Sequence, residues 1–234
     1  MSLELSGRRI VIAGGTSGIG RATAKSCSEK GASTLILGRN PQKLSSAVNA
    51  LQRTKGKLCD VRNSEDCQNA IEFANHEMGG IDGLIFCAGV GKIASIEDLS
   101  FDHYREMIEV NLIGAFNMIK AIVPFLKTSS NSNIILMGSR AGRYAFKGGT
   151  GYCAAKFGTQ GLAEALFLDV KKYGIAVTLI APGTVATGFA NVQKQSWHLK
   201  AEDIAETVIN CLKMHPNANI NWIEIRPMGD SSVG

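Results

Sequence analysis

Short apolar runs alternate with longer amphipathic stretches along the whole chain. Seven of these runs are rich in Ile, Val and Leu and too short for buried helices, so we predict them as strands. Their nearly continuous apolar character is typical of strands that are covered on both faces of a parallel sheet. The predicted strands span residues 8–13, 33–38, 56–60, 83–88, 133–138, 175–181 and 219–225.

Helix-length segments separate the predicted strands, and several of them carry boundary signals. Gly31 is a C-cap signal, and Pro41 follows a capping Asn40. Ser64 is predicted as the N-cap of a helix that closes on Gly79. The predicted helices span residues 20–31, 40–54, 64–80, 102–126, 151–174 and 200–215.

The repeated alternation of strand and helix, with short connections, defines the expected fold. It predicts an α/β, Rossmann-like, three-layer doubly wound fold with a central seven-stranded parallel sheet. No linker, repeat or low-complexity stretch interrupts the pattern. Residues 1–234 are therefore predicted to form a single domain.

Composition and charge exclude several classes of function. The chain is 45% hydrophobic and 19% charged, which is typical of a globular protein. Its net charge is +5, but basic residues are scattered with no run longer than a pair, so we expect no nucleic-acid partner. No signal peptide and no apolar stretch of about 18 residues is apparent, so we expect no membrane association and a cytoplasmic location.

The cysteines and histidines form no metal-binding pattern. The six cysteines include no C-x-x-C pair, and we interpret them as packing residues in a reducing compartment. No metal site is predicted. Four histidines without ligand spacing are interpreted as surface residues: His76, His103, His198 and His215.

A glycine-rich segment, "AGGTSGIGRA", stands between the first predicted strand and its helix. Gly14, Gly18 and Gly20 follow a G-x-x-x-G-x-G spacing, related to the G-x-G-x-x-G fingerprint. Glycines let the backbone turn tightly and approach a pyrophosphate, which the N–H groups at the helix start then bind. A tight strand–helix turn without a ligand is the simpler alternative. The position in a βαβ unit favours a dinucleotide cradle.

The end of the second predicted strand indicates which dinucleotide would bind. Where a carboxylate would meet free ribose hydroxyls, the chain has Gly38 and then Arg39. An arginine attracts a 2′-phosphate that a carboxylate would repel. We therefore expect NADP(H) to be preferred over NAD(H), with a solvated loop arginine as the alternative.

Tyr152 and Lys156 are four residues apart in "GYCAAKFG", so on a helix they share one face. Hydride transfer to a carbonyl needs an acid, and a phenol serves if its pKa falls from about 10 towards neutrality. We expect the Lys156 cation to lower the pKa of Tyr152. Ser139, just past the fifth predicted strand, can orient the developing alkoxide.

With these motifs the chain resembles the short-chain dehydrogenase/reductase family over nearly its whole length. "GGTSGIG" is similar to its T-G-x-x-x-G-x-G, "FCAG" (86–89) to N-N-A-G, "YCAAK" to Y-x-x-x-K and "PGTVAT" (182–187) to P-G-x-x-x-T. The resemblance implies that Asp60 in "CDV" contacts adenine and that Asn111 in "VNLIGAF" holds a relay water for Lys156. One departure is that Phe86 and Cys87 replace both asparagines, which puts local stability or loop geometry in doubt.

The resemblance defines two expected sets of residues. The catalytic set is Asn111, Ser139, Tyr152 and Lys156. The cofactor-binding set is Gly14, Thr16, Ser17, Gly18, Ile19, Gly20, Arg39, Asn40, Asp60, Val61, Ala88, Gly89, Tyr152, Lys156, Pro182, Gly183, Val185 and Thr187.

The expected function is an NADP(H)-dependent carbonyl reductase or alcohol dehydrogenase acting on a small or medium substrate. A non-catalytic NADP(H)-binding regulatory or assembly protein is the alternative, and an epimerase or dehydratase is disfavoured by the short C-terminal region. The resemblance also implies a homodimer or homotetramer. Lys92, Arg140 and Arg143 are candidates to bind a substrate carboxylate. Candidate pocket walls are Val90, Lys92, Arg140, Tyr144, Phe146, Phe189 and Trp197.

Overall fold

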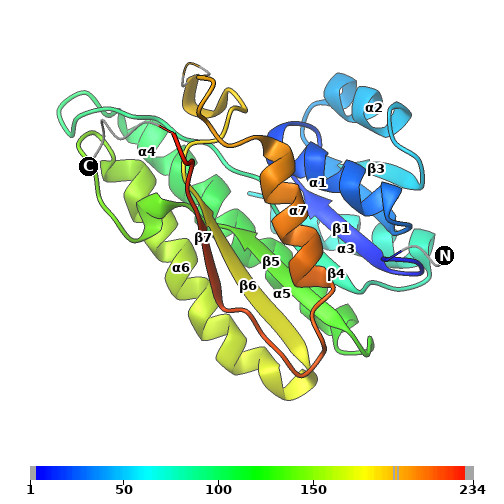
Figure 1. Ribbon diagram of the computed structural model, residues 1–234. Coiled ribbons are helices and arrows are strands. Elements are labelled where there is room, and N and C mark those ends of the chain that lie inside the picture. The colour runs from blue at the N-terminus through cyan, green and yellow to red at the C-terminus, as the bar shows by residue number, and fades with distance from the viewer. Residues whose placement is uncertain (1–3, 192, 194, 230–234) are drawn as a thin grey trace.

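The structure, a computed structural model, describes residues 4–191, 193 and 195–229 (Figure 1). Seven strands form one parallel sheet in the order β3-β2-β1-β4-β5-β6-β7. This confirms the predicted doubly wound fold. The strands are β1 (Arg9–Ala13), β2 (Ser33–Gly38), β3 (Thr54–Leu58), β4 (Gly83–Phe86), β5 (Ser132–Met137), β6 (Ile175–Pro182) and β7 (Trp222–Ile225).

Helices cover both faces of this sheet (Figure 1). Helices α1, α2 and α7 pack on one face, and α3, α4, α5 and α6 on the other, so the molecule has three layers. The helices are α1 (Gly18–Glu29), α2 (Pro41–Asn49), α3 (Ser64–Met78), α4 (Phe101–Ile108), α5 (Gly114–Leu126), α6 (Thr150–Val170) and α7 (Ala201–Leu212).

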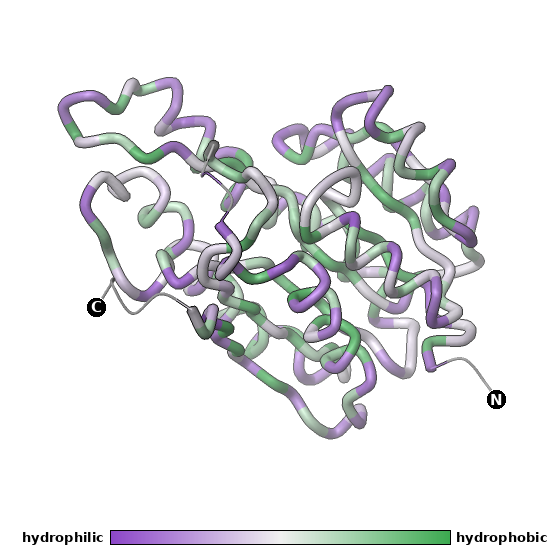
Figure 2. The backbone as a smooth tube through the Cα atoms, turned by 45° about the horizontal axis from the view of Figure 1, so that its top comes forward, coloured by the Kyte–Doolittle hydropathy of each residue, from purple (hydrophilic) through white to green (hydrophobic). Residues whose placement is uncertain are grey.

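The sheet interior explains the continuous apolar runs of the sequence. In β1, Val11 faces the cluster under α3 and α5, whereas Ile10 and Ile12 face the cluster under α1 and α7. All three are fully buried. Burial of each such side chain contributes roughly 1.5–3 kcal/mol, which favours apolar residues at successive positions of the central strands. Figure 2 shows the hydrophobic colour along these central strands.

Several predicted boundaries shift in the structure. β3 begins at Thr54 rather than residue 56, because Thr54 pairs with Thr34 of β2 and their hydroxyls lie 2.7 Å apart. The N-cap of α3 is Asn63 rather than Ser64, because the Asn63 side chain accepts hydrogen bonds from two backbone N–H groups of the first turn. β4 and β7 are also shorter than the predicted strands.

The single helix predicted over residues 102–126 is interrupted. A π-helical turn, Glu109–Ile113, separates α4 from α5. By length and composition the stretch Phe101–Leu126 could span a membrane, but Met118, Ile122 and Leu126 are fully buried in the cluster shared with α3 and β4. Its apolar content is therefore explained by packing within this fold.

Parallel pairing brings the carboxyl ends of all seven strands to one edge of the sheet. The chain order reverses between β1 and β4, where β1 pairs with β2 on one side and β4 on the other. Such a reversal opens a crevice outside the carboxyl ends of the strands, and ligands of doubly wound folds bind there. The loops that follow β1, β4, β5 and β6 meet at this edge.

Candidate active site

The turn from β1 into α1 is a backbone cradle with no room for a side chain at Gly14 or Gly20. Gly14 has φ +78°, and a Cβ there would lie 2.6 Å from the backbone nitrogen of Ala88. A Cβ on Gly20 would lie 2.2 Å from the carbonyl oxygen of Gly14. The N-cap Ser17 is extended and its side chain makes no capping hydrogen bond. The first N–H groups of α1 are therefore left for another acceptor, and this fits a pyrophosphate.

Arg39 and Asp60, two of the predicted cofactor residues, lie together past the carboxyl ends of β2 and β3. Arg39 Nη1 lies 3.9 Å from Asp60 Oδ2, and the Arg39 side chain is 45% exposed. Asp60 pairs more closely with Arg62, whose Nη2 lies 2.5 Å from Oδ2 and whose hydrogen bonds lower the pKa of that carboxyl. Arg62 was missed by sequence reasoning, although it follows Asp60 by two residues. Asn40 caps α2, accepting from the backbone N–H of Lys43 at 2.8 Å.

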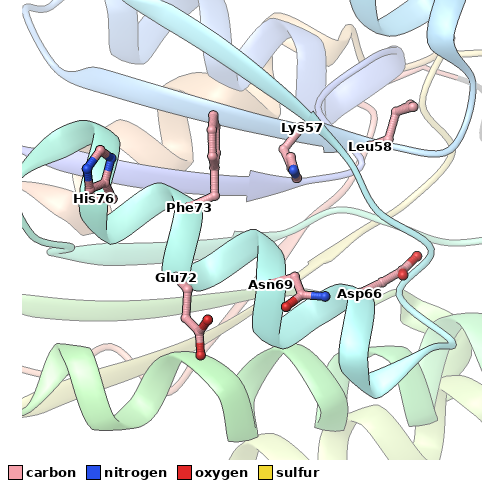
Figure 3. Close-up of a pocket in the computed structure, with 7 residues that line it drawn as sticks. All are labelled: Lys57, Leu58, Asp66, Asn69, Glu72, Phe73 and His76. Carbon is pink, nitrogen blue, oxygen red and sulfur yellow. The ribbon is translucent and has the colours of Figure 1, made fainter.

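Two hollows adjoin this end of the crevice. One, of about 410 Å³, is lined by Arg39, Asp60 and neighbouring residues of β3. The other, of about 600 Å³, follows β3 and α3 (Figure 3), where Lys57 lies over the ring of Phe73. Both are open and lie on the β3 side of the sheet, away from Tyr152. We associate only the first with the predicted cofactor site.

The π-helical turn positions Asn111. Its side-chain amide donates to the carbonyl of Met107, four residues earlier, at 2.7 Å and to the carbonyl of Val90 at 2.9 Å. The first of these bonds takes an acceptor that a regular α-helix would use, and π turns are frequent at functional sites. Asn111 Oδ1 is buried without a partner among the described residues, close to Gly89 and 1% exposed as a residue.

Ser139, Tyr152 and Lys156 come together at the carboxyl end of β5. Ser139 caps a short 3₁₀ turn, accepting from the N–H of Ala141 at 3.1 Å. Tyr152 and Lys156 lie on the first turns of α6, and Lys156 Nζ is 5.8 Å from the centre of the Tyr152 ring. Lys156 is 5% exposed, and its Nζ donates to the carbonyl of Met137 at 2.8 Å.

The prediction that Lys156 lowers the pKa of Tyr152 is wrong. Burial raises the pKa of Tyr152 to about 12, opposed by a hydrogen bond with Ser139, and Lys156 is not among the causes. The reason is geometric, because the ammonium is directed to the Met137 carbonyl. Burial also lowers the pKa of Lys156 to about 8.

The ends of β4 and β6 complete the crevice. Cys87 stands at the position of the second asparagine in the N-N-A-G motif. A Cβ on Gly20 would lie 3.2 Å from Cys87 Cβ, so Cys87 lies against the glycine cradle. Past β6, Gly183 donates to the carbonyl of Ile225 at 2.7 Å, and Thr187 lies against Gly18 at the start of α1. The P-G-x-x-x-T segment therefore reaches the glycine cradle. Val185, another predicted cofactor residue of this segment, forms an isolated β-bridge with Leu199.

The remaining predicted cofactor residues are placed as follows. Thr16 lies against Gly38, where a Cβ would be 2.5 Å from Thr16 Cγ2. Ile19 packs on the α1 and α7 face. Val61 is buried, and its carbonyl accepts from Asn117 Nδ2 at 3.0 Å. Pro182 ends β6 and pairs with Ile225.

Two predicted pocket cations contact β7. Arg140 Nε lies 3.4 Å from Glu224 Oε1, and the Arg143 guanidinium lies over the ring of Trp222. Phe189 packs on the ring of Tyr152, with the ring centres 5.6 Å apart. His198, predicted to be a surface residue, is buried at 8% exposure because it caps a turn, its Nδ1 accepting from the N–H of Gln195.

The cradle and the crevice are those of an oxidoreductase that binds a nicotinamide dinucleotide. A family profile described as short chain dehydrogenase matches residues 8–197. The chain is 32% identical to an uncharacterized oxidoreductase of Staphylococcus aureus (strain MW2) over 96% of this chain and 99% of that protein. We conclude that the chain belongs to the short-chain dehydrogenase family.

Two further similarities extend the comparison. A 3-dehydrosphinganine reductase of Danio rerio is 33% identical over 88% of this chain and 64% of that protein. The solved closed form of a serine dehydrogenase with NADP⁺ superposes with a TM-score of 0.90 at 26% identity, covering 96% of this chain and 97% of that one. The chain is therefore an oxidoreductase of the type that acts on CH–OH or carbonyl groups.

Proposed function

We propose that the protein transfers hydride between NADPH and a carbonyl or alcohol substrate, with Tyr152 as general acid and base. The observation that carries the proposal is the convergence of Ser139, Tyr152 and Lys156 on the crevice that begins at the glycine cradle. The 3-dehydrosphinganine reductase among the relatives supports carbonyl reduction as the reaction type.

The residues have separate roles in this mechanism. A bound nicotinamide cofactor would supply the hydride that the carbonyl carbon accepts. The Tyr152 hydroxyl gives its proton to the carbonyl oxygen, so ketone becomes alcohol; at neutral pH a pKa of about 12 keeps that proton available. Ser139, whose hydroxyl favours the phenolate form of Tyr152, orients the oxygen. Lys156 holds the ribose end, and the unpartnered Asn111 Oδ1 is an acceptor for a relay water that returns a proton to Tyr152.

The alternative, a non-catalytic protein that binds NADP(H), requires that no substrate be turned over. The first experiment measures NADPH oxidation with aldehydes, ketones, keto acids and quinones, for the native protein, Tyr152→Phe and Tyr173→Phe. Tyr173 is an exposed tyrosine at the opposite edge of the sheet and serves as the control. We expect turnover to fall at least 100-fold in Tyr152→Phe alone. NADPH binding without any turnover would instead support the non-catalytic regulatory or assembly role.

NADP(H) preference is proposed from the pairing at the adenosine end. Arg62 holds Asp60 closely, so Asp60 keeps only a long contact with Arg39. Arg39 is thereby available to a 2′-phosphate, a charge-assisted contact that contributes roughly 1.5–3 kcal/mol. In Arg39→Ala we expect NADPH affinity to fall roughly 10- to 100-fold with NADH affinity nearly unchanged. Titration of both cofactors tests this, with Arg105→Ala on α4 as control, and a surviving NADPH preference would contradict it.

A homodimer or homotetramer is proposed from the outer faces of α5 and α6. Phe116 on α5 and Phe157 and Leu168 on α6 are between 46% and 62% exposed. Large apolar side chains gathered on two neighbouring helices are typical of an interface. Light scattering of the native protein and of Phe116→Ser/Phe157→Ser tests it: we expect an oligomer that the double variant dissociates, and a native monomer would contradict it.

A further inference from the structure

Exposed apolar side chains gather on the three loops that follow β4, β5 and β6. These strands are neighbours in the sheet, so their carboxyl ends open on the same side as Tyr152. Between 38% and 69% of each of these side chains is exposed, although connecting loops are normally polar. They are Ile93 and Ile96 after β4, Tyr144 and Phe146 after β5, and Phe189 after β6. We call these five residues the apolar mouth.

The first two loops touch each other. The N–H of Ala94 donates to the carbonyl of Gly148 at 2.9 Å. A Cβ on Gly148 would lie 3.1 Å from Ile93 Cγ2, so Ile93 lies on the second loop. A Cβ on Gly149 would lie 2.9 Å from the Phe146 ring. Gly148 and Gly149 directly precede α6 in the chain. Ile93 and Phe146 therefore lie beside the start of the helix that carries Tyr152.

The third loop joins this surface to the reacting group. The ring of Phe189 is 5.6 Å from that of Tyr152, in a tilted arrangement. A Cβ on Gly91 would lie 2.6 Å from the Phe189 ring, so the loop after β4 passes against the same ring. Phe189 therefore lies between the ring of Tyr152 and the loop that carries Ile93.

The two arginines expected to bind a carboxylate already have partners. Arg143 lies over Trp222 of β7, and Arg140 lies between Glu224 of β7 and the ring of Tyr144, whose centre is 5.5 Å from the guanidinium carbon. A carboxylate on the apolar mouth would lose its hydration and would have to compete with Glu224 for Arg140. An aliphatic or aromatic group, in contrast, would gain free energy from each methylene it buries there.

We propose that the substrate is a ketone or aldehyde whose carbonyl carries an apolar chain or ring, and that this chain lies across the apolar mouth. The inference rests on the proposed reductase function and adds the substrate class. Ile93 and Phe146 are then specificity-determining residues, and Phe189 positions the first part of the chain beside Tyr152.

The test is a series of methyl ketones from 2-butanone to 2-octanone, assayed by NADPH oxidation. Each methylene buried in the mouth should raise kcat/KM roughly three- to fourfold, or roughly 100-fold across the four added methylenes. The octanone-to-butanone ratio should fall at least tenfold in Ile93→Ser and in Phe146→Ser. Met214→Ser, which removes an exposed apolar side chain just after α7, is the matched control and should keep the native ratio. Urea unfolding checks that each variant is folded.

The outcomes separate the two proposals. Turnover of 2-butanone with a flat response to chain length, or an equal ratio in Phe146→Ser and Met214→Ser, overturns the apolar mouth and leaves the reductase standing. If no ketone is turned over, calorimetry of the same ketones with the NADP⁺-loaded protein decides. Affinity that rises with chain length and is lost in Phe146→Ser supports the mouth although the reductase fails, and flat affinity overturns it.

Discussion

Lys156 is a buried cation whose removal should stabilise the protein. It is 5% exposed, its Nζ donates only to the Met137 carbonyl, and it makes no ion pair within the part of the chain that the structure describes. Burial lowers its pKa from 10.5 to about 8. The perturbation is Lys156→Met, which keeps an unbranched side chain of similar length and removes the charge.

The magnitude follows from that change in pKa. One pKa unit corresponds to about 1.4 kcal/mol, so lowering the pKa from 10.5 to about 8 makes the buried ammonium unfavourable by roughly 3 kcal/mol. The variant also loses the hydrogen bond to Met137, and a hydrogen bond from a charged donor contributes roughly 1.5–3 kcal/mol. We expect Lys156→Met to raise the free energy of unfolding by up to about 1.5 kcal/mol at pH 7, while cofactor binding and turnover are lost.

The contribution of Lys156 to the free energy of unfolding changes with pH. Below about pH 8, Lys156 is protonated in the folded and unfolded states, and the full unfavourable contribution is present. Between about pH 8 and 10.5 the unfolded chain binds more protons than the folded one, so native stability rises with pH through this window. The variant has no such dependence, and its advantage should shrink towards pH 10.

Urea unfolding followed by circular dichroism at pH 7, 8, 9 and 10 measures this difference. Lys43→Met, at an exposed lysine on α2, is the control and should stay within about 0.5 kcal/mol of the native protein. A Lys156→Met protein that is no more stable than native at pH 7, with a gap that does not change up to pH 10, would refute the reasoning.

Two further predictions concern the cradle and the opposite edge of the sheet. Gly20→Ala places a Cβ 2.2 Å from the Gly14 carbonyl, so it should cost at least about 2 kcal/mol and abolish NADPH binding, measured by urea unfolding and cofactor fluorescence. Gly161→Ala in α6 meets nothing within 4 Å and, as control, should stabilise by up to about 1 kcal/mol. Asp82→Asn breaks the ion pair of the buried Asp82 with the partly exposed Arg9 and should cost roughly 2 kcal/mol in the same unfolding assay. Burial raises the pKa of Asp82, but hydrogen bonds from Arg9 and Ser129 outweigh it and lower that pKa overall, so its contribution is present above about pH 4 and lost as pH falls; stability that stays level through that range would contradict it.

The central strands could be predicted from the sequence because both faces of each strand are buried. β1, β2 and β5 were predicted to within one residue, since the inner positions of all three strands are buried. The edge strands were predicted less well. Every residue of β7 is only half-buried, so burial does not mark where this strand begins. The predicted strand included residues of the preceding loop and began three residues too early.

Other misses arise from contacts that no local pattern reveals. The π turn at Glu109–Ile113 depends on Asn111 reaching both Met107 and Val90, and Val90 lies in a distant loop. Arg140 was predicted as a pocket wall because it follows the fifth strand, but its contact with Glu224 on the last strand could not be predicted. Charge pairs between distant segments set where these side chains point, and sequence spacing does not record them.

The departure at Phe86 and Cys87 connects the fold to the electrostatics of the site. The backbone is unaffected, because Cys87 still donates its N–H to the Ala13 carbonyl at 2.8 Å, and Phe86 packs in the core. A thiol offers a much weaker hydrogen-bond acceptor than an asparagine amide would. Burial raises the pKa of Cys87 to about 12, so the thiol is neutral beside Lys156 and supplies no charge to it at neutral pH. Lys156 therefore keeps only its hydrogen bond to the Met137 carbonyl among the described residues, and burial lowers its pKa.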